Sequence, residues 1–260
     1  MYIEMQPVPS AESPNDTNDE PIRNLPTPWL NILTSMPFYC LIVVQCANSW
    51  AYDIILTQLP TYIKGVLQTD IKKNAIFSSL PFWVMLGLSY FFVFISEVLR
   101  RTKCMSMSVS RRFFNSLGNW IPAIGLISLG YMGKENETLV IVLLMIIVGM
   151  MAATYLGFVL NHIDLSPNFA GTLMGIANCI AHLTSITAPL SVGFIVTDEK
   201  NPEQWRIVFF LTASFLFLGN LLFITFGKFE TQYWNEPPQP VIVKTLKNNS
   251  QHSVYKDTVH

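Results

Sequence analysis

Charged side chains are scarce in this sequence. Lysine, arginine, aspartate and glutamate together make up 13% of the 260 residues, whereas 51% of the residues are hydrophobic. A soluble globular protein has about 25% charged residues, so this composition excludes an ordinary soluble domain. The hydrophobic residues also gather in continuous blocks of about 20 residues or more, the length that one helical crossing of a membrane requires.

Cysteine is also scarce, and the pattern of a secretory signal is missing. The chain has four cysteines, and three of them (Cys40, Cys46 and Cys179) lie within apolar blocks, so no disulfide framework is expected. The first residues have neither a basic start nor an apolar h-region. We therefore expect the first crossing to act as its own insertion signal.

Six apolar blocks predict six transmembrane helices and an all-α membrane protein. The blocks are continuously apolar, whereas the strands of a membrane barrel would alternate over about ten residues. The predicted crossings are residues 37–59, 76–99, 113–132, 139–160, 172–197 and 207–227. Residues 29–230 then form the six-helix bundle. Residues 1–28 and 231–260 are polar and proline-rich, and they are expected to be disordered tails.

The distribution of basic residues predicts that both termini are cytoplasmic. This topology places ten basic residues inside, namely Arg23, Arg100, Arg101, Lys103, Arg111, Arg112, Lys228, Lys244, Lys247 and Lys256. It places six outside, namely Lys64, Lys72, Lys73, Lys134, Lys200 and Arg206. Cytoplasmic loops carry the excess of lysine and arginine. The densest cluster, "SEVLRRTKCMSMSVSRR", is either a topological anchor, a cytoplasmic gate or a contact with anionic lipid.

Polar residues in the first crossing are costly in lipid and point to a specific role. Asn48, Ser49, Tyr52 and Asp53 lie within about one and a half helical turns, and Asn48 and Tyr52 share a face because they are four residues apart. An ionisable group in a span usually faces a partner or an aqueous path. Two interpretations remain open: a polar face that lines a solute path, and interhelical hydrogen bonds that only hold the bundle together.

The fifth crossing combines small and polar residues. Gly171 and Gly175 form a small-xxx-small step, which predicts close packing of another helix. Asn178 and His182 place two polar groups on one face and join the predicted solute path. Pro189 predicts a kink, because proline removes a backbone donor.

The turn before the fifth crossing is polar as well. Ser166 followed by Pro167 is typical of a helix N-cap and first position, and Asp164 favours the same helix start. Capping does not account for Asn161 and His162. They form either a cytoplasmic latch that opens during function or a hydrogen-bonded helix end. We group Asn161, His162 and Asp164 with Arg100 and Arg101 as a predicted cytoplasmic gate.

The segment "NHIDLSPNFAGTLMGIAN" at 161–178 closely resembles a motif of the anion/cation symporter family of solute carriers. That family includes the type I sodium-phosphate cotransporters, sialin and the vesicular glutamate transporters. Further matches are "LTSMPFYCLIV", "NSWAYDIILTQLPTYIKGVL", "SSLPF" and "EQWRIVFFLTA". They occur in the family's order over residues 28–235. The phosphate-cotransporter-like members of insects are the most similar, since they share Asn48 where glutamate-transporting relatives carry arginine.

The resemblance implies a major facilitator fold, in which twelve helices form two six-helix halves around a central site. All the matched segments belong to the second half, so this chain resembles the C-terminal half alone. The family's principal anion-binding arginine and its coupling carboxylate lie in the first half. Asp53 departs from the family, which commonly has an aromatic residue there, and it places a negative charge near the expected anion path.

The predicted function is cation-coupled symport of an inorganic or organic anion by a half-length, phosphate-cotransporter-like chain, with Na⁺ or H⁺ as coupling ion. The alternative is a half-length membrane protein that transports nothing and associates with full-length relatives. An enzyme is not expected, because His162, Asp164 and Ser166 occur without a G-x-S-x-G or H-E-x-x-H motif. No cofactor, metal site or nucleic-acid partner is expected. The expected partners are membrane lipid, a small anionic solute and another half-unit or a full-length relative, in the plasma membrane or an endolysosomal or vesicular membrane.

Overall fold

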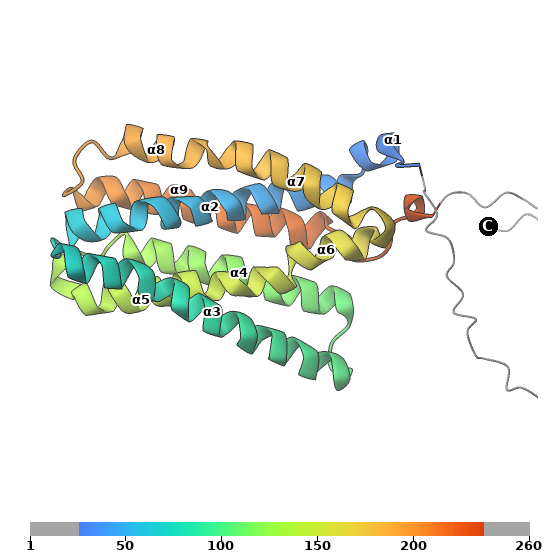
Figure 1. Ribbon diagram of the computed structural model, residues 1–260, viewed down its shortest axis with the longest axis horizontal. Coiled ribbons are helices and arrows are strands. Elements are labelled where there is room, and N and C mark those ends of the chain that lie inside the picture. The colour runs from blue at the N-terminus through green and yellow to red at the C-terminus, as the bar shows by residue number, and fades with distance from the viewer. Residues whose placement is uncertain (1–25, 237–260) are drawn as a thin grey trace, which may run out of the picture.

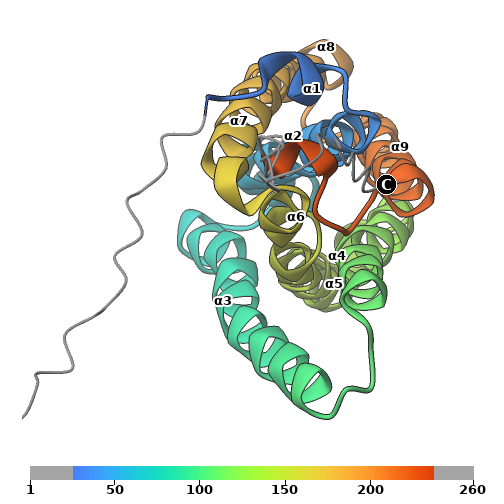
Figure 2. The same ribbon diagram turned by 90° about the vertical axis from the view of Figure 1, so that its right-hand side faces the viewer.

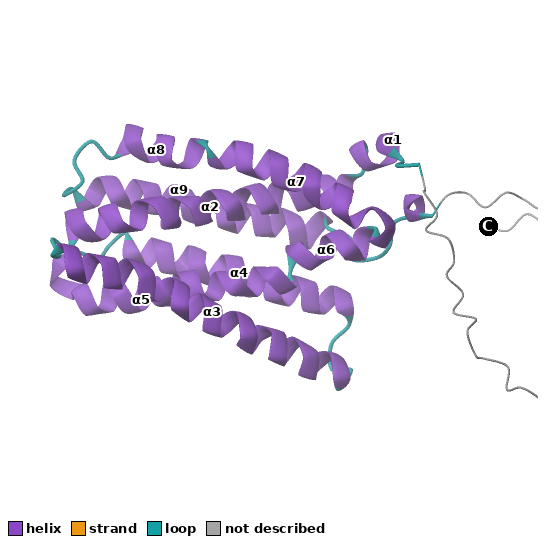
Figure 3. Ribbon diagram, viewed as in Figure 1, coloured by secondary structure: helices purple, strands orange, loops and turns teal. Residues whose placement is uncertain are grey.

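Each of the six apolar blocks forms helix in the computed structural model, which describes residues 26–236 (Figure 3). The α-helices are α1 (Trp29–Leu33), α2 (Met36–Val66), α3 (Ile71–Arg101), α4 (Met107–Leu129), α5 (Glu137–Met151), α6 (Phe158–Leu165), α7 (Ala170–Ser185), α8 (Thr187–Ile195) and α9 (Pro202–Phe226). Short 3₁₀ helices are η1 (Lys134–Asn136), η2 (Ala152–Leu156), η3 (Pro167–Phe169) and η4 (Tyr233–Asn235). The described residues contain no strand, which confirms the all-α prediction.

Five helical stretches within residues 26–236 are long and apolar enough to cross a membrane. They are Met36–Val66, Ile71–Arg101, Lys134–Leu165, Pro167–Ile195 and Pro202–Phe226. The third predicted crossing is α4, a helix of 23 residues, which at about 1.5 Å per residue also reaches across a hydrocarbon core. It differs in composition, because Arg111, Arg112, Asn115 and Asn119 interrupt its apolar sequence. Arg111, Asn115 and Asn119 make polar contacts with neighbouring helices.

Two of the predicted crossings are interrupted helices. The fifth divides into α7 and α8 around Ile186. Pro189 explains this break, because a proline ring clashes with the carbonyl four residues earlier, here that of Ser185, where α7 ends. The fourth divides into α5, η2 and α6, and α6 begins after Gly157. Interrupted membrane helices commonly surround the binding sites of transporters.

Helix α2 occupies the centre of the bundle and packs against α7, α8 and α9 (Figures 1 and 2). Its contact with α7 and α8 is close because the facing residues Ala177, Ala181 and Ala188 are small and fully buried. Helix α4 packs between α5 and α9. The largest hydrophobic cluster joins α2, α4, α5, α8 and α9, so the core lies along most of the length of the bundle.

Helix α3 is the exception to this packing. It lies against α5 and η2, and only Pro81 and Phe92 among its 31 residues are buried. Its C-terminal end diverges from the other helices in both views (Figures 1 and 2). Most of its apolar surface is therefore left without a protein neighbour in the described chain.

We call the end of the bundle that carries α1, the α3–α4 loop, the α6–α7 turn and η4 the terminal end, because the described chain begins and ends there (Figure 1). The chain does not leave the bundle after α9. Residues 229–235, here called the strap, return across the α6–α7 turn. Phe229 and Trp234 of the strap are buried with Phe38, Leu165 and Phe223. The folded chain thus extends beyond residue 230, the predicted boundary, whereas residues 1–25 and 237–260 of the predicted tails lie outside the described residues.

Candidate functional site

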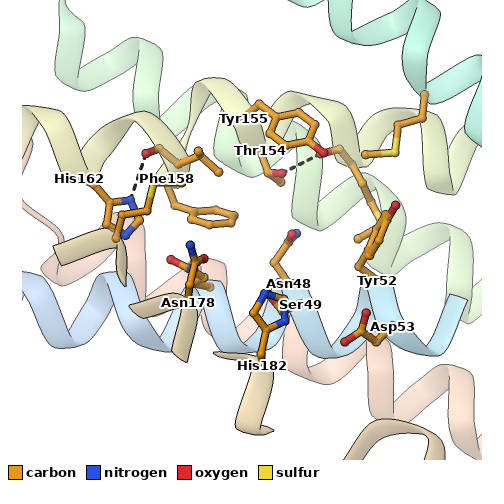
Figure 4. Close-up of a pocket in the computed structure, with 15 residues that line it drawn as sticks. Asn48, Ser49, Tyr52, Asp53, Thr154, Tyr155, Phe158, His162, Asn178 and His182 are labelled. Atoms are coloured by element: carbon orange, nitrogen blue, oxygen red, sulfur yellow. Dashed lines mark hydrogen bonds between the residues drawn. The ribbon is translucent and has the colours of Figure 1, made fainter. Parts of the chain in front are cut away.

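A polar pocket of ≈ 370 Å³ opens between α2, η2, α6 and α7, at mid-length of the membrane-spanning helices (Figure 4). Helix α2 supplies one wall because Gln45, Asn48, Ser49 and Tyr52 follow the i, i+3, i+4, i+7 spacing of one helical face. The residues that line the pocket are Gln45, Asn48, Ser49, Tyr52, Asp53, Met85, Met151, Thr154, Tyr155, Phe158, Val159, His162, Met174, Asn178 and His182. The pocket therefore combines α2 and α7 on one side with η2 and α6 on the other.

All five residues predicted for the solute path line this pocket, namely Asn48, Tyr52, Asp53, Asn178 and His182. Figure 4 shows those of α2 and α7 across the pocket from Thr154, Tyr155 and Phe158. The polar face of α2 borders the pocket and also reaches α4. Asn48 lines the pocket and also donates a hydrogen bond of 3.4 Å to the Oδ1 of Asn119. The roles of these residues in transport stay predictions.

A network of buried side-chain amides next to the pocket joins α2, α4 and α9. Asn119 donates to the carbonyl oxygen of Asn115 at 2.8 Å, and the Asn115 amide donates to Oδ1 of Asn220 at 2.7 Å. All three side chains are fully buried. Satisfied amides in a low-dielectric interior stabilise one arrangement of the helices, because an unpaired amide there costs about 1–3 kcal/mol. Sequence reasoning missed these residues, although the i, i+4 spacing of Asn115 and Asn119 in an apolar block was a usable signal.

Asn115 also fixes the break before α6. Its Oδ1 accepts a hydrogen bond of 3.1 Å from the backbone N–H of Phe158, the first residue of α6. The residue before, Gly157, lies so close that a Cβ atom there would be 2.5 Å from this same oxygen. Only glycine leaves room for the Asn115 side chain at this position. The break positions Phe158 and His162 on the wall of the pocket.

Two buried polar atoms on the pocket wall lack a hydrogen-bond partner among the described residues, namely Oε1 of Gln45 and Nε2 of His162. The Gln45 amide nitrogen donates to Oδ1 of Asn178, and the His162 Nδ1 is 3.0 Å from the carbonyl oxygen of Val159. Each residue is therefore held in place by one atom while a second atom stays available. Such unpaired atoms on a pocket wall are suited to bind a polar ligand.

The residues that line the pocket include a carboxylate and two histidines. Among the described residues that line the pocket there is no lysine or arginine, whereas Asp53, His162 and His182 can ionise. Asp53 makes no ion pair within residues 26–236. The wall formed by this chain thus offers hydrogen-bonding groups and a carboxylate, and it does not itself supply a fixed positive charge.

The residues predicted as a cytoplasmic gate lie in four places. Arg100 and Arg101 both bind Glu97 on the exposed surface of α3, at 2.8 and 2.7 Å. His162 lines the pocket. Asn161 is fully buried, and neither of its side-chain amide atoms has a partner in the described part of the chain.

Asp164 pairs with Arg111, which the sequence analysis placed in the basic cluster between the second and third crossings. The guanidinium donates two hydrogen bonds to the carboxylate, at 2.6 and 3.2 Å, and a third to the carbonyl oxygen of Leu156 at 3.0 Å. Both side chains are about nine-tenths buried. The prediction that Asp164 favours the start of the fifth crossing is therefore wrong: Asp164 belongs to α6, and its carboxylate joins α6 to α4.

Ser166 occupies the N-cap position of η3 with Pro167 at the first position, as predicted, but its side chain does not cap. The Ser166 hydroxyl donates to Oδ1 of Asn235 in the strap at 2.7 Å. The same Oδ1 accepts the backbone N–H of Asn168 at 3.0 Å, and the Asn168 amide donates to the carbonyl oxygen of Asn235 at 2.9 Å. A side chain distant in the sequence thus provides the cap.

The prediction that Gly171 and Gly175 bring another helix close is wrong for the described chain. A Cβ atom at either position would meet no atom within 4 Å. Helix α7 packs on α2 through its other face, where Leu173, Ala177 and Ala181 are buried. The small residues that allow close packing are therefore the alanines, because they lie on the face toward α2.

Apolar spanning helices around a polar pocket define a multi-pass integral membrane protein. A family model described as the Major Facilitator Superfamily matches residues 2–189, and the chain belongs to this superfamily. This finding confirms the family resemblance noted in the sequence.

Three relatives give the resemblance more detail. A protein of Drosophila ananassae named "Putative inorganic phosphate cotransporter" is 36% identical over 231 residues, which cover 88% of this chain and 48% of that protein. Vesicular glutamate transporter 1 of Bos taurus is 33% identical over 84% of this chain and 39% of its own length. Human sialin is 31% identical over 80% of this chain and 41% of its own length. The chain therefore spans about half the length of these relatives or less.

Proposed function

We propose that this chain forms one half of a secondary active transporter and that the polar pocket is its wall of the solute path. The observation that carries this proposal is the pocket itself, with unpartnered polar atoms of Gln45 and His162 at mid-length of the spanning helices. The transporter names of the relatives support a carrier rather than an enzyme. In the major facilitator architecture the substrate lies between two halves that rock against each other.

The proposed solute is an inorganic or organic anion, with inorganic phosphate as the first candidate. The similarity to the Drosophila protein supports this choice. The wall described here lacks a fixed positive charge, so the anion's counter-charge comes from a second half or from a coupling cation. Asp53 is the proposed contact of that cation, Na⁺ or H⁺, because it is a carboxylate on the pocket wall without an ion-pair partner in the described chain.

Uptake into liposomes tests the proposal directly. The complete chain is reconstituted at a density that allows two copies to supply the two halves. The entry of radiolabelled phosphate is then followed under an inward Na⁺ gradient and, separately, under an inward H⁺ gradient. Asn48→Ala and Asn178→Ala are expected to reduce uptake at least tenfold, because each removes a hydrogen-bonding group from the wall. Gln58→Ala is the matched control, an amide on the same helix outside the pocket, and it is expected to leave uptake unchanged.

The coupling ion is read from the same experiment. Asp53→Asn is expected to abolish the stimulation of uptake by whichever gradient drives it, while the variant still inserts and folds. If uptake by the Asp53→Asn variant still depends on the gradient, Asp53 does not take part in coupling. Full activity of both Asn48→Ala and Asn178→Ala would contradict the assignment of the pocket.

A second candidate function is supported by the exposed surface of α3. Residues such as Trp83, Tyr90 and Phe94 are more than 60% exposed, so a large apolar face is free to contact another membrane protein. The chain would then bind a full-length relative and alter its traffic or stability without transporting solute. Silent liposomes together with co-purification of a co-expressed full-length relative would favour this function over transport.

A further inference from the structure

A second pocket, of ≈ 540 Å³, lies at the terminal end between α3, α4, η2 and α6. None of its lining residues is shared with the polar pocket described above. Part of its lining is apolar and includes Leu99, Leu156 and Leu160, and part is basic and includes Arg100, Arg101 and Arg111. We call it the α3–α4 pocket.

The α3–α4 pocket exists because α3 and α4 diverge. Helix α3 packs on α5 and η2, and its last turns stand away from α4 in Figures 1 and 2. Residues 102–106 connect the two helices. Lys103 adopts a left-handed backbone with φ 53°, which ends α3 and turns the chain toward α4.

The basic part of the lining of the α3–α4 pocket has more donors than acceptors. Arg111 is neutralised by Asp164. Arg100 and Arg101, in contrast, share the single carboxylate of Glu97. Arg101 uses only its Nε in that contact, so both of its terminal nitrogens are without an acceptor in residues 26–236. The two arginine side chains are 67% and 77% exposed, which leaves their remaining donors accessible for an anion.

Exposed apolar residues lie on α3 next to the pocket, and one of them, Val93, also lines it. Val93, Phe94 and Val98 precede the two arginines by a few residues and are 55%, 64% and 40% exposed. In a membrane-spanning helix, apolar residues followed by a cluster of arginines mark the boundary between the hydrocarbon core and the lipid headgroups. A ligand that fits both parts of the lining has an anionic group next to an apolar chain.

We propose that the α3–α4 pocket binds an anionic phospholipid, with its phosphate on Arg100 and Arg101 and an acyl chain along the apolar part of the lining. Arginine suits this task because its fork of N–H groups binds phosphate oxygens in pairs. Basic pockets between membrane helices on the cytoplasmic side are known to bind such headgroups. The proposal does not depend on the transport proposed above, because it concerns a separate pocket.

Native mass spectrometry of the detergent-purified complete chain tests the proposal. The chain is titrated with phosphatidylserine and, in parallel, with phosphatidylcholine of the same acyl chains. We expect one phosphatidylserine to bind at concentrations where phosphatidylcholine does not. Arg100→Gln/Arg101→Gln is expected to weaken this binding roughly 25-fold, because each basic residue contributes about fivefold to the affinity for an anionic lipid.

A matched control lies at the opposite end of the same helix. Lys72→Gln/Lys73→Gln removes two adjacent exposed cations from the first turn of α3 and should leave the bound phosphatidylserine unchanged. Equal loss in both double variants would mean a diffuse charge effect and would overturn the proposal. Should the arginine variant fail to fold, the wild-type titrations still decide, since equal retention of the two lipids contradicts an anionic site.

Inorganic phosphate distinguishes a lipid site from a site for the free ion. Addition of phosphate in the millimolar range should leave the bound phosphatidylserine in place, because the free ion gains nothing from the apolar part of the lining. Full displacement of the lipid by inorganic phosphate would show that the arginines bind a soluble anion and would overturn the assignment of a phospholipid.

Discussion

The terminal end and the polar pocket use polar side chains in opposite ways. At the terminal end, Arg111 with Asp164 and Ser166 with Asn235 form paired contacts. In the pocket, Gln45 and His162 keep one buried atom each without a partner in the described chain. Because an unpaired buried group lowers stability, the polar contacts of the first region stabilise the fold, whereas the unpaired atoms of the second region reduce its stability. Substitutions of paired and of unpaired buried groups should therefore change stability in different directions.

The largest loss of stability is expected from Asp164→Ala. Removal of the carboxylate leaves the Arg111 guanidinium buried without its partner, and breaking a buried pair in this way costs about 3–5 kcal/mol. Equilibrium unfolding in mixed detergent micelles measures the loss. Glu97→Ala is the control, because its carboxylate lies on the surface with the exposed Arg100 and Arg101, and no measurable change is expected there. Equal effects of the two substitutions would abolish the distinction between buried and exposed charge at this end.

A smaller loss of stability is expected from Gly157→Ala, at a crowded point of the backbone between the two regions. Gly157→Ala forces its Cβ against Oδ1 of Asn115, and overpacking of this kind costs about 1–3 kcal/mol. Gly171→Ala is the matched control, since its Cβ meets open space within helix α7. Replacing a helical glycine with alanine there should stabilise the chain by about 0.5–1 kcal/mol. A stable Gly157→Ala variant would mean that the amide network is free to move.

Asn235→Ala tests the strap. The substitution removes the side-chain oxygen that accepts from Ser166 and from the backbone of Asn168, and loss of a capping residue costs about 1–2 kcal/mol. Thermal unfolding of the purified chain, followed by tryptophan fluorescence, measures the decrease. Tyr233→Ala in the same strap should have little effect, because its ring is 81% exposed. Comparable decreases in the two variants would show that the strap contributes by bulk and not by its hydrogen bonds.

The smallest change carries the opposite sign. Asn161→Leu replaces a buried amide that has no partner among the described residues with an apolar side chain of the same branching and the same number of heavy atoms. Because the substitution removes the unpaired amide, it is expected to stabilise the chain by about 1 kcal/mol. The predicted latch function requires that uptake falls in the same variant, because stability and activity are often opposed at functional positions. If Asn161→Leu were less stable than the wild type, the amide would have a structural partner.

The sequence predicted the helices well and the polar contacts unevenly. Long apolar blocks dictate spanning helices by the solvation of the backbone alone, and the i, i+4 spacing of Asn48 with Tyr52 and of Asn178 with His182 brought four residues to one pocket. Long-range pairs have no such local signal. The partners Arg111 and Asp164 are 53 residues apart, and their pairing depends on how α4 and α6 pack. The same reason explains the misassigned Gly171, since a small-residue pattern does not show which helix face meets a neighbour.

The strap has a consequence for the synthesis of the protein. Ser166 and Asn235 are 69 residues apart in the chain, so the partner of the α6–α7 turn is translated only after α7, α8 and α9. At about 5–20 residues per second this interval lasts on the order of 3–14 s. During that time the Ser166 hydroxyl and the Asn168 backbone must be hydrated or held by the insertion machinery. The α6–α7 turn is therefore secured only after the 69 residues that follow Ser166 have been made, and assembly of the bundle finishes from its C-terminal side.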